Sequence, residues 1–237
     1  PSVPQGWKTE QLRVQTISTY PTSVVQGTEF QIQIPQLPNT FLDPTTSYLN
    51  VRATFKWKHA AGTTSSLSDP AENPLLLGSG WSLFQRYELY FNNSNLLDQI
   101  MYPGVFVNAM LNCTMTPNQR IGCPNMGFGD VTGIYPNQAT TLSTNDGVLR
   151  ATGNGNDGVT RQCTVDFAIP LIGVIGHATD KLLPLMLGGM RIDLTADTIT
   201  NYLKSGSKAF SETPEIAFNN LEFVSNVVTV DAGSLAA

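Results

Sequence analysis

The sequence contains few charged residues and no concentration of positive charge. Charged side chains make up 13% of its 237 residues, about half of the usual share of roughly 25%. The Lys and Arg residues are spread thinly, and the net charge is −5. A protein that binds nucleic acid through its phosphates needs a local cationic patch. We therefore expect no direct contact with nucleic acid.

Cysteine is scarce, and long uninterrupted apolar runs are absent. Cys113, Cys123 and Cys163 form no CxxC pair, which favours free thiols in a reducing compartment over a disulfide framework. We expect no signal peptide before the domain. The most apolar segment, residues 166–194, is broken by prolines, glycines and a polar cluster. A membrane-spanning helix needs about 20 predominantly apolar residues, so we expect no transmembrane segment.

The chain has only two histidines, and neither belongs to a recognised metal-binding or catalytic pattern. His59 ends a predicted strand, and His177 lies in a Gly-Ala-Thr turn. Neither has the spacing of an HExxH or Cys/His site, so we expect both to be surface turn residues. The G-x-S-x-G pattern of a serine hydrolase is absent. Cys163 lies on the apolar side of a predicted strand, which indicates an inert thiol.

Two further chemical signals are weak. Gly153, Gly155 and Gly158 match G-x-G-x-x-G, but an alternating strand follows where a dinucleotide site needs a helix. The same stretch lacks the carboxylate spacing of a calcium loop. The carboxylates expected to point outward are scattered over several strands: Glu88, Asp166, Asp193 and Glu222. The sequence singles out no catalytic, cofactor-binding or metal-binding residue, and we expect no enzyme, although a β-sandwich hydrolase with a convergent acid pair stays open.

The sequence is rich in short segments of alternating polarity. Phe30, Ile32 and Ile34 alternate with polar residues, which is the pattern of a half-buried strand. The same alternation predicts further strands over residues 49–58, 162–169 and 190–194, one or two strands over residues 214–230, and a β-hairpin over residues 83–99. A hairpin turn is expected over residues 92–95 and a short helix near Pro103. The tryptophans are expected to be core or anchor residues: Trp7, Trp57 and Trp81.

Seven to nine strands with long loops and little helix predict an all-β fold. The expected architecture is an eight-stranded antiparallel jelly-roll sandwich with long loops and a short helix. The long loops are expected over residues 59–80, 113–158 and 201–214. The expected organisation is an N-terminal extension over residues 1–27, a jelly-roll domain over residues 28–231, and a tail or linker over residues 232–237.

Three stretches resemble the double-jelly-roll major capsid proteins, the family of adenovirus hexon and of the capsid proteins of virophages and large DNA viruses. They are FQIQIPQLPNTFLDPTTSYLNVRATFKW, SLFQRYELYFNNSNLLDQI and FAIPLIGVIGHATDKLLPLMLGGMRIDL, and NNLEFVSNVVTVD follows as the last strand. The resemblance covers the order of elements over most of residues 28–231. A double jelly roll needs about twice as many strands. The chain therefore resembles one jelly roll of such a protein, or a single-jelly-roll relative.

The resemblance implies a structural subunit of an icosahedral viral capsid that assembles into trimeric pseudo-hexagonal capsomers. Its implied partners are further copies of the chain, neighbouring capsomers, and minor capsid or penton proteins. Its implied location is the virion capsid, assembled in the host cytoplasm or nucleus. The length and the Gly, Pro and Met content of residues 101–135 and 113–158 suggest that they lie at subunit contacts or on the shell exterior.

An alternative function is a carbohydrate-binding jelly roll, or an attachment module of a spike or fibre head. This alternative predicts exposed aromatic residues clustered on one sheet face or at loop tips. The aromatic residues of the chain instead alternate toward the inside along the predicted strands, which weighs against it.

Overall fold

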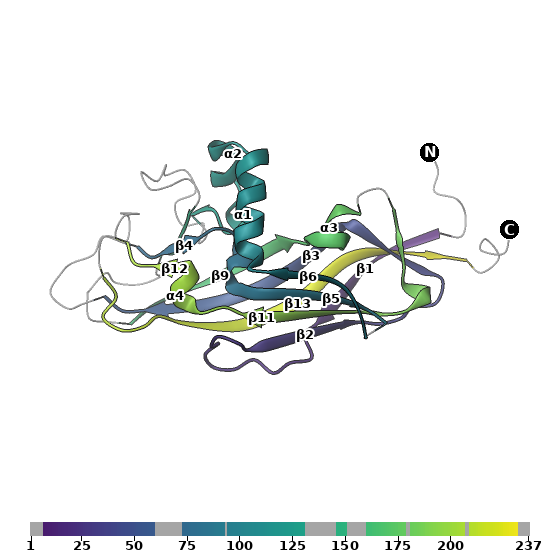
Figure 1. The fold of residues 1–237 in the computed structure, drawn as a ribbon, viewed down its shortest axis with the longest axis horizontal. Helices are drawn as coiled ribbons and strands as arrows, with labels where there is room; N and C mark the ends of the chain where they lie inside the picture. Colours follow the sequence, from purple (N-terminus) through teal and green to yellow (C-terminus); the bar gives the residue numbers. More distant parts are fainter. Residues whose placement is uncertain are drawn as a thin grey trace.

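The alternating segments form strands that pack as two antiparallel sheets (Figure 1). The computed structural model describes residues 7–59, 73–92, 94–130, 146–150, 160–178, 181–206 and 209–231. One sheet has five strands in the order β1-β13-β3, after which β3 pairs with both β9 and the short β10 (Leu183–Pro184). The other sheet has the order β2-β11-β5-β6. Their bounds are β1 Trp7–Gln15, β2 Glu29–Ile34, β3 Thr40–Trp57, β5 Phe84–Phe91, β6 Asn95–Met101, β9 Arg161–Pro170, β11 Met190–Ala196 and β13 Glu215–Val230.

The eight strands pair in a nested order. The first strand pairs with the last, the second with the seventh, the third with the sixth, and the fourth with the fifth, always antiparallel. This is the connectivity of a jelly roll, in which two Greek keys fold into a two-sheet sandwich. The expected eight-stranded antiparallel jelly roll is confirmed.

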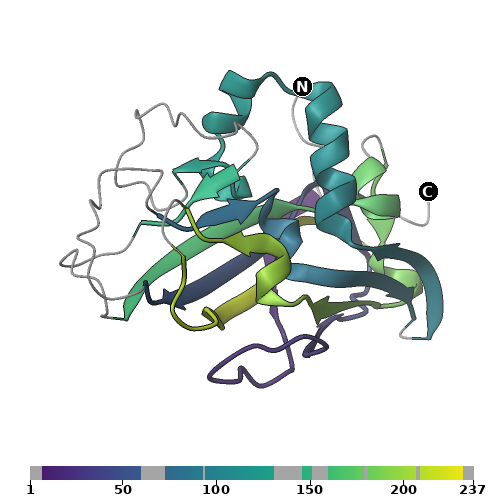
Figure 2. The same ribbon diagram turned by 60° about the vertical axis from the view of Figure 1, so that its left-hand side comes forward.

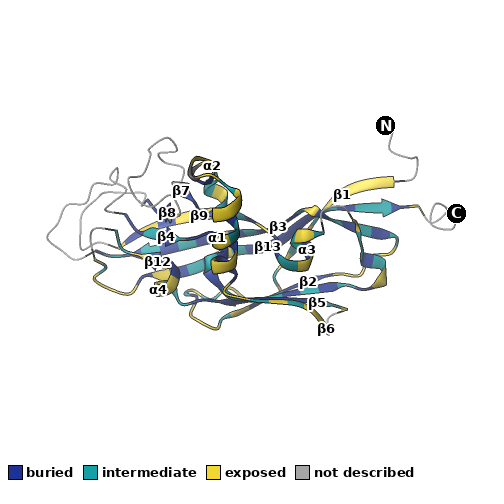
Figure 3. Cartoon of the chain, turned by 45° about the horizontal axis from the view of Figure 1, so that its top comes forward, coloured by how far each residue is buried: buried dark blue, intermediate teal, exposed yellow. Residues whose placement is uncertain are grey.

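The first strand lies within the segment for which we expected an N-terminal extension. β1 pairs with β13 along its whole length, from Trp7 opposite Val230 to Gln15 opposite Glu222. Leu12 and Val14 pack against the core, so β1 belongs to the sandwich. Its first residues are exposed (Figure 3), and Trp7 is 45% exposed. Trp7 is therefore not a core residue of this chain.

β3 begins nine residues before the segment in which the polarity alternates most regularly, and it contains a proline. Its pairing with β13 jumps from Tyr48 opposite Val224 to Asp43 opposite Asn226, so residues 44–47 form a bulge. Pro44 has no backbone N–H to contribute to the ladder, and a bulge is where a strand tolerates it. β13 is one long strand with two such irregularities.

The core lies between the two sheets, where the inward side of each strand is buried (Figure 3). Removing one large apolar side chain from water contributes about 1.5–3 kcal/mol to stability. Trp81, in the 3-10 helix η2 (Gly80–Leu83), is fully buried and contacts Tyr87 at a ring-centroid distance of 5.4 Å. Its Nε1 donates to the carbonyl of Pro170 at 2.9 Å, which joins the start of β5 to the end of β9. Cys163 is buried, as expected.

We expected a long loop over residues 113–158, but part of this segment forms helices and short strands. The helix α1 (Pro103–Thr114) is followed by α2 (Pro117–Ile121) and by η3 (Pro124–Met126). Proline at the first helical positions and a capping box between Thr116 and Gln119 start these helices. A small third sheet has the order β12-β4-β8-β7, with bounds β12 Leu203–Lys204, β4 Leu75–Leu77, β8 Asp146–Val148 and β7 Gly129–Asp130.

The connection between β9 and β11 is also folded into short elements. It holds α3 (Gly173–His177), β10 (Leu183–Pro184) and η4 (Leu185–Leu187), and α4 (Ile199–Tyr202) follows β11. In Figures 1 and 2, α1 stands away from the two sheets, with α4 and β12 near its base. Within the described ranges, no helix combines the length and apolar character needed to cross a membrane.

Candidate assembly surface

The two histidines occupy different settings from those expected. His59 is 1% exposed, forms an isolated bridge with Phe210 and stacks on its ring, so it is not a surface turn residue. The segment around Phe210 and Ser211 runs beside the end of β3, where the backbone N–H of Ser211 donates to the carbonyl of Lys58. The ring of Phe210 in this segment covers the imidazole of His59. His177 ends α3, and its Nδ1 lies 2.8 Å from the carbonyl oxygen of Gly173. Short helical geometry thus replaces the expected turn.

Two of the four carboxylates expected to point outward are buried. Glu88 accepts hydrogen bonds from Gln99 Nε2 at 2.7 Å and from the Tyr90 hydroxyl at 3.3 Å. Glu222 is 5% exposed and accepts from Asn50 Nδ2 at 2.7 Å and from Arg13 at 3.3 Å. Both lie on the polar side of their strands, but the side chains of polar neighbours cover them.

The structure brings Asp166 and Glu222 to one polar hollow on the outer face of the first sheet. Arg52 lies 3.6 Å from Asp166, and Arg13 lies 3.3 Å from Glu222. Each of the two carboxylates therefore already forms an ion pair with an arginine of this chain. Asp193 lies elsewhere and pairs with Arg191 at 3.0 Å. Among the residues that the structure describes, no three His, Cys, Asp or Glu side chains are placed to hold a metal ion. The glycine motif of residues 153–158 lies outside these ranges.

α1 is fixed to the sandwich by its first turn. The backbone N–H of Tyr102 donates to the Gln85 carbonyl at 2.7 Å, and Val107 and Leu111 are buried against the core. Gly104 allows the close approach, because a Cβ there would lie 2.6 Å from the Cα of Ser82 in η2. The helix is therefore held by backbone packing and by its inward side chains.

The end of β6, the N-cap and the first turn of α1 carry large exposed apolar side chains. Val105 is 71% exposed, Met101 51%, Tyr102 47% and Phe106 44%. We call these four residues the α1 patch. Residues 99–119 contain no charged side chain, and no other stretch of the sequence without charge is as long. A surface helix normally has charged and polar residues on its outward face, so the α1 patch is an unusual surface.

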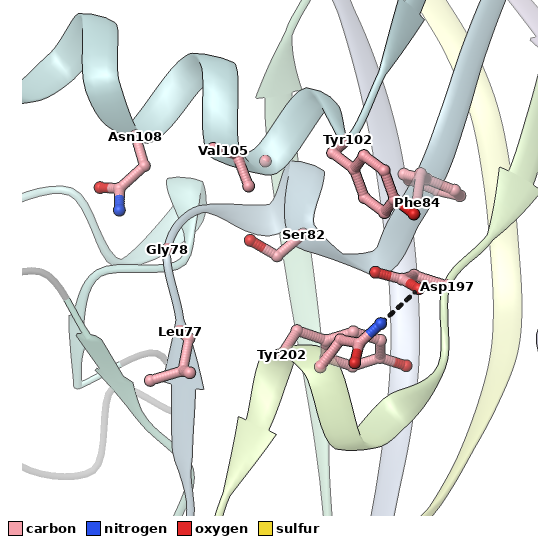
Figure 4. Close-up of a pocket in the computed structure, with 11 residues that line it drawn as sticks. Leu77, Gly78, Ser82, Phe84, Tyr102, Val105, Asn108, Asp197 and Tyr202 are labelled. Atoms are coloured by element: carbon pink, nitrogen blue, oxygen red, sulfur yellow. Dashed lines mark hydrogen bonds between the residues drawn. The ribbon is translucent and has the colours of Figure 1, made fainter.

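A cleft of about 420 Å³ adjoins the α1 patch, and Tyr102 and Val105 form part of its wall (Figure 4). We call it the α1 cleft. Apolar side chains from three other elements complete the wall: Leu77, Phe84 and Tyr202. Polar groups stand between them: Ser82, Asn108, Asp197 and Asn201. The space thus combines an apolar wall with a few hydrogen-bonding groups.

Some polar atoms of the α1 cleft form hydrogen bonds within this chain, and others form none with the described residues. Asp197 Oδ1 accepts from the Thr198 backbone at 2.7 Å and from Asn201 Nδ2 at 2.9 Å. Burial raises the pKa of the Tyr202 hydroxyl, and the charge of Asp197 raises it further. Within the described part of the chain, the buried Oδ1 of Asn108 accepts no hydrogen bond. A buried acceptor left without a donor is costly.

Sequence reasoning missed the four residues of the α1 patch as a group, although it suggested that residues 101–135 lie at contacts. It expected aromatic residues to turn inward, whereas Tyr102, the N-cap residue of α1, and Phe106, in the first turn of α1, are exposed. The missed signal is helical spacing. Val107 and Leu111 face the core at a separation of four residues, which leaves the apolar Val105 and Phe106 outside.

No family model and no curated protein matches the sequence. Among solved structures, a chain of the cryo-EM structure of the Sputnik virophage matches with a TM-score of 0.64 and 10% sequence identity, over 98% of this chain and 50% of that chain. The crystal structure of the mavirus major capsid protein matches with a TM-score of 0.52 and 12% identity, over 96% of this chain and 47% of that one.

This chain spans about half the length of both of these chains. At 10–12% identity the likeness concerns the fold, and it includes nearly every residue of this chain. The nested strand pairing and these matches lead to one conclusion. The chain has a jelly-roll fold that matches about half of a chain of the Sputnik virophage structure and about half of the mavirus major capsid protein.

Proposed function

We propose that this chain is a structural subunit of a viral capsid. The observation that carries the proposal is the fold match to the Sputnik virophage chain, which includes 98% of this chain at a TM-score of 0.64. The mavirus match supports it, because that protein is a major capsid protein. The proposed location is the virion capsid, and the proposed role is mechanical rather than enzymatic.

The proposed assembly is a trimer that contacts neighbouring capsomers and minor capsid or penton proteins. Subunits that contact each other head to tail close into a ring when the rotation between them allows it. A chain with two jelly rolls then gives a trimer with a pseudo-hexagonal outline, since each copy contributes two similar lobes. The low share of charged residues, 13%, supports broad contacts, because charged residues are depleted at the centre of protein interfaces.

The mass of the purified protein in solution tests this proposal. Multi-angle light scattering coupled to size exclusion is expected to give the mass of three chains at micromolar concentration. A mass that stays at one chain across the accessible concentration range would contradict assembly through this chain.

A further inference from the structure

We propose that the α1 cleft binds a primary alkylammonium ion, which is a positively charged amine attached to an apolar chain. The cleft has a volume of about 420 Å³ and is lined by both apolar and polar side chains. Small-molecule sites in proteins typically occupy about 300–1,000 Å³. The proposal goes beyond the structural role of a capsid subunit and does not depend on it.

The charge of the α1 cleft identifies the sign of the ligand. Among the described residues that line it, one carries a carboxylate, Asp197, and none is cationic. Asp197 is only 7% exposed, and no ion pair joins it to the described part of the chain. A buried charge without a counter-ion is costly, and a bound cation removes that cost. The cleft therefore favours a positively charged ligand over a neutral or negative one.

Two polar atoms of the α1 cleft are free to accept a hydrogen bond from a ligand. Oδ1 of Asp197 is used by Thr198 and Asn201 at the start of α4, but Oδ2 has no partner among the described residues. The Tyr202 hydroxyl, on a side chain that is 2% exposed, has none either. Neither atom is fully enclosed by protein, so both open into the cleft. An ammonium group carries three N–H donors and no acceptor, which suits two acceptors.

Aromatic rings lie beside the carboxylate. Phe84, Tyr102 and Tyr202 line the α1 cleft, and in the view of Figure 4 Asp197 lies between Tyr102 and Tyr202. An organic cation is attracted to the face of an aromatic ring within about 6 Å of its centre. Rings next to a carboxylate therefore favour an organic cation over a small inorganic ion, which loses its hydration against an apolar wall.

The apolar part of the wall lies away from the charge. In Figure 4, Leu77 and Val105 are on the side of the α1 cleft away from Asp197. A ligand whose ammonium group reaches Asp197 thus places its alkyl chain against Leu77 and Val105, where burial of the chain stabilises the complex. A quaternary ammonium fits less well, because it has no N–H for the free acceptors. The ligand is therefore a primary amine.

Calorimetric titration of the full chain with n-butylammonium tests the proposal. A dissociation constant of about 1 mM or lower is expected for a ligand of this size in a preformed cleft. Butan-1-ol has the same alkyl chain without the charge, and it is expected to bind about tenfold more weakly or worse. Equal affinity for the two compounds, or no saturable binding of n-butylammonium up to about 50 mM, overturns the proposal and leaves the proposed capsid function untouched.

Asp197→Asn tests the charge. The substitution keeps an oxygen that accepts from the Thr198 backbone, so the fold is expected to stay intact, which circular dichroism and thermal unfolding verify. The dissociation constant of n-butylammonium is expected to rise about tenfold or more. Asp166→Asn is the matched control, because it removes one charge on the outer face of the first sheet. It is expected to stay within about twofold of the parent, and an equal loss in both variants contradicts the proposal.

Tyr202→Phe tests the second acceptor and does not depend on the folding of Asp197→Asn. Its hydroxyl has no hydrogen bond to the described residues, so thermal stability near pH 7 is expected to be unchanged. The dissociation constant of n-butylammonium is expected to rise about three- to tenfold, because one acceptor is lost. Lower stability with unchanged affinity would instead assign the hydroxyl a structural role and contradict the proposed site.

Lysine blocked at its amino and carboxyl ends distinguishes two sources of the same chemical group. Its side chain is a butylammonium chain attached to a peptide backbone. Binding at least as tight as that of n-butylammonium assigns the α1 cleft to a lysine side chain of a protein partner. Weaker binding assigns it to a free amine. Both results support an alkylammonium site, and the titration with n-butylammonium decides whether the site exists.

Discussion

At the scale of single residues, the interior holds polar groups whose settings decide how stability responds to pH. The hydroxyl of Tyr87 is buried between the sheets and has no hydrogen-bond partner in the described part of the chain. Burial raises the pKa of this hydroxyl, and the negative charge of Asp98 raises it further. The folded state therefore keeps a proton that the unfolded chain releases near pH 10.

This setting predicts the effect of Tyr87→Phe. A raised pKa in the folded state contributes stability that is fully present below the unfolded value of about 10 and is lost as pH rises above it. Tyr87→Phe is expected to reduce this alkaline loss in urea unfolding. Near pH 7 the substitution is expected to change stability by less than about 1 kcal/mol, because no hydrogen bond is removed.

Tyr90→Phe is the matched comparison on the same strand. The Tyr90 hydroxyl donates to Glu88, so its removal is expected to cost about 0.5–1.5 kcal/mol near pH 7. A larger loss near pH 7 for Tyr87→Phe than for Tyr90→Phe would contradict this account of the two hydroxyls.

Residue-scale expectations from the sequence were accurate where alternation alone decides burial. Phe30, Ile32 and Ile34 are buried, as their spacing predicts. His59 and Glu88 were misplaced, because their burial depends on what lies over them. Phe210, distant in the sequence, stacks on His59, and the side chains of Tyr90 and Gln99 cover Glu88. No local pattern indicates such cover.

At the scale of elements, β1 decides where the jelly roll begins. Its nine residues pair with β13, and Leu12 and Val14 pack against the core. Without β1, the outer edge of the long strand β13 would lose its ladder and part of its apolar cover. We therefore propose a domain that starts before residue 28, with β1 as its first strand.

Truncation tests this boundary. Deletion of residues 1–15 is expected to lower the midpoint of urea unfolding strongly or to make the chain insoluble, since it removes a whole strand of the sandwich. Deletion of residues 1–6 leaves β1 complete and serves as the control. Equal midpoints for the parent and the chain without residues 1–15 would support an N-terminal extension outside the domain.

The elements differ in how well the sequence reveals them. β2, β5, β9 and β11 follow from alternation within each segment. β1 was not predicted as a strand, because its first half is exposed on both faces and shows little alternation in polarity. α1 was expected only as a short helix, because its charge-free sequence lacks the amphipathic pattern of a surface helix.

At the scale of the whole molecule, the arrangement of strands carries the functional conclusion. The order of strands along the chain favoured a jelly roll, but the pairing of the first strand with the last joins residues at opposite ends of the sequence. Local patterns do not encode such pairing. The fold match is the observation on which the proposal of a capsid subunit rests.

Negative-stain electron microscopy of the purified protein tests the central claim most directly. The account predicts closed shells or particles with three-fold symmetry. Such a particle has three lobes where each subunit holds one jelly roll, and a pseudo-hexagonal outline where each holds two. A field that contains only single-subunit particles, at concentrations where the protein stays folded, would contradict the claim that this chain builds a viral capsid.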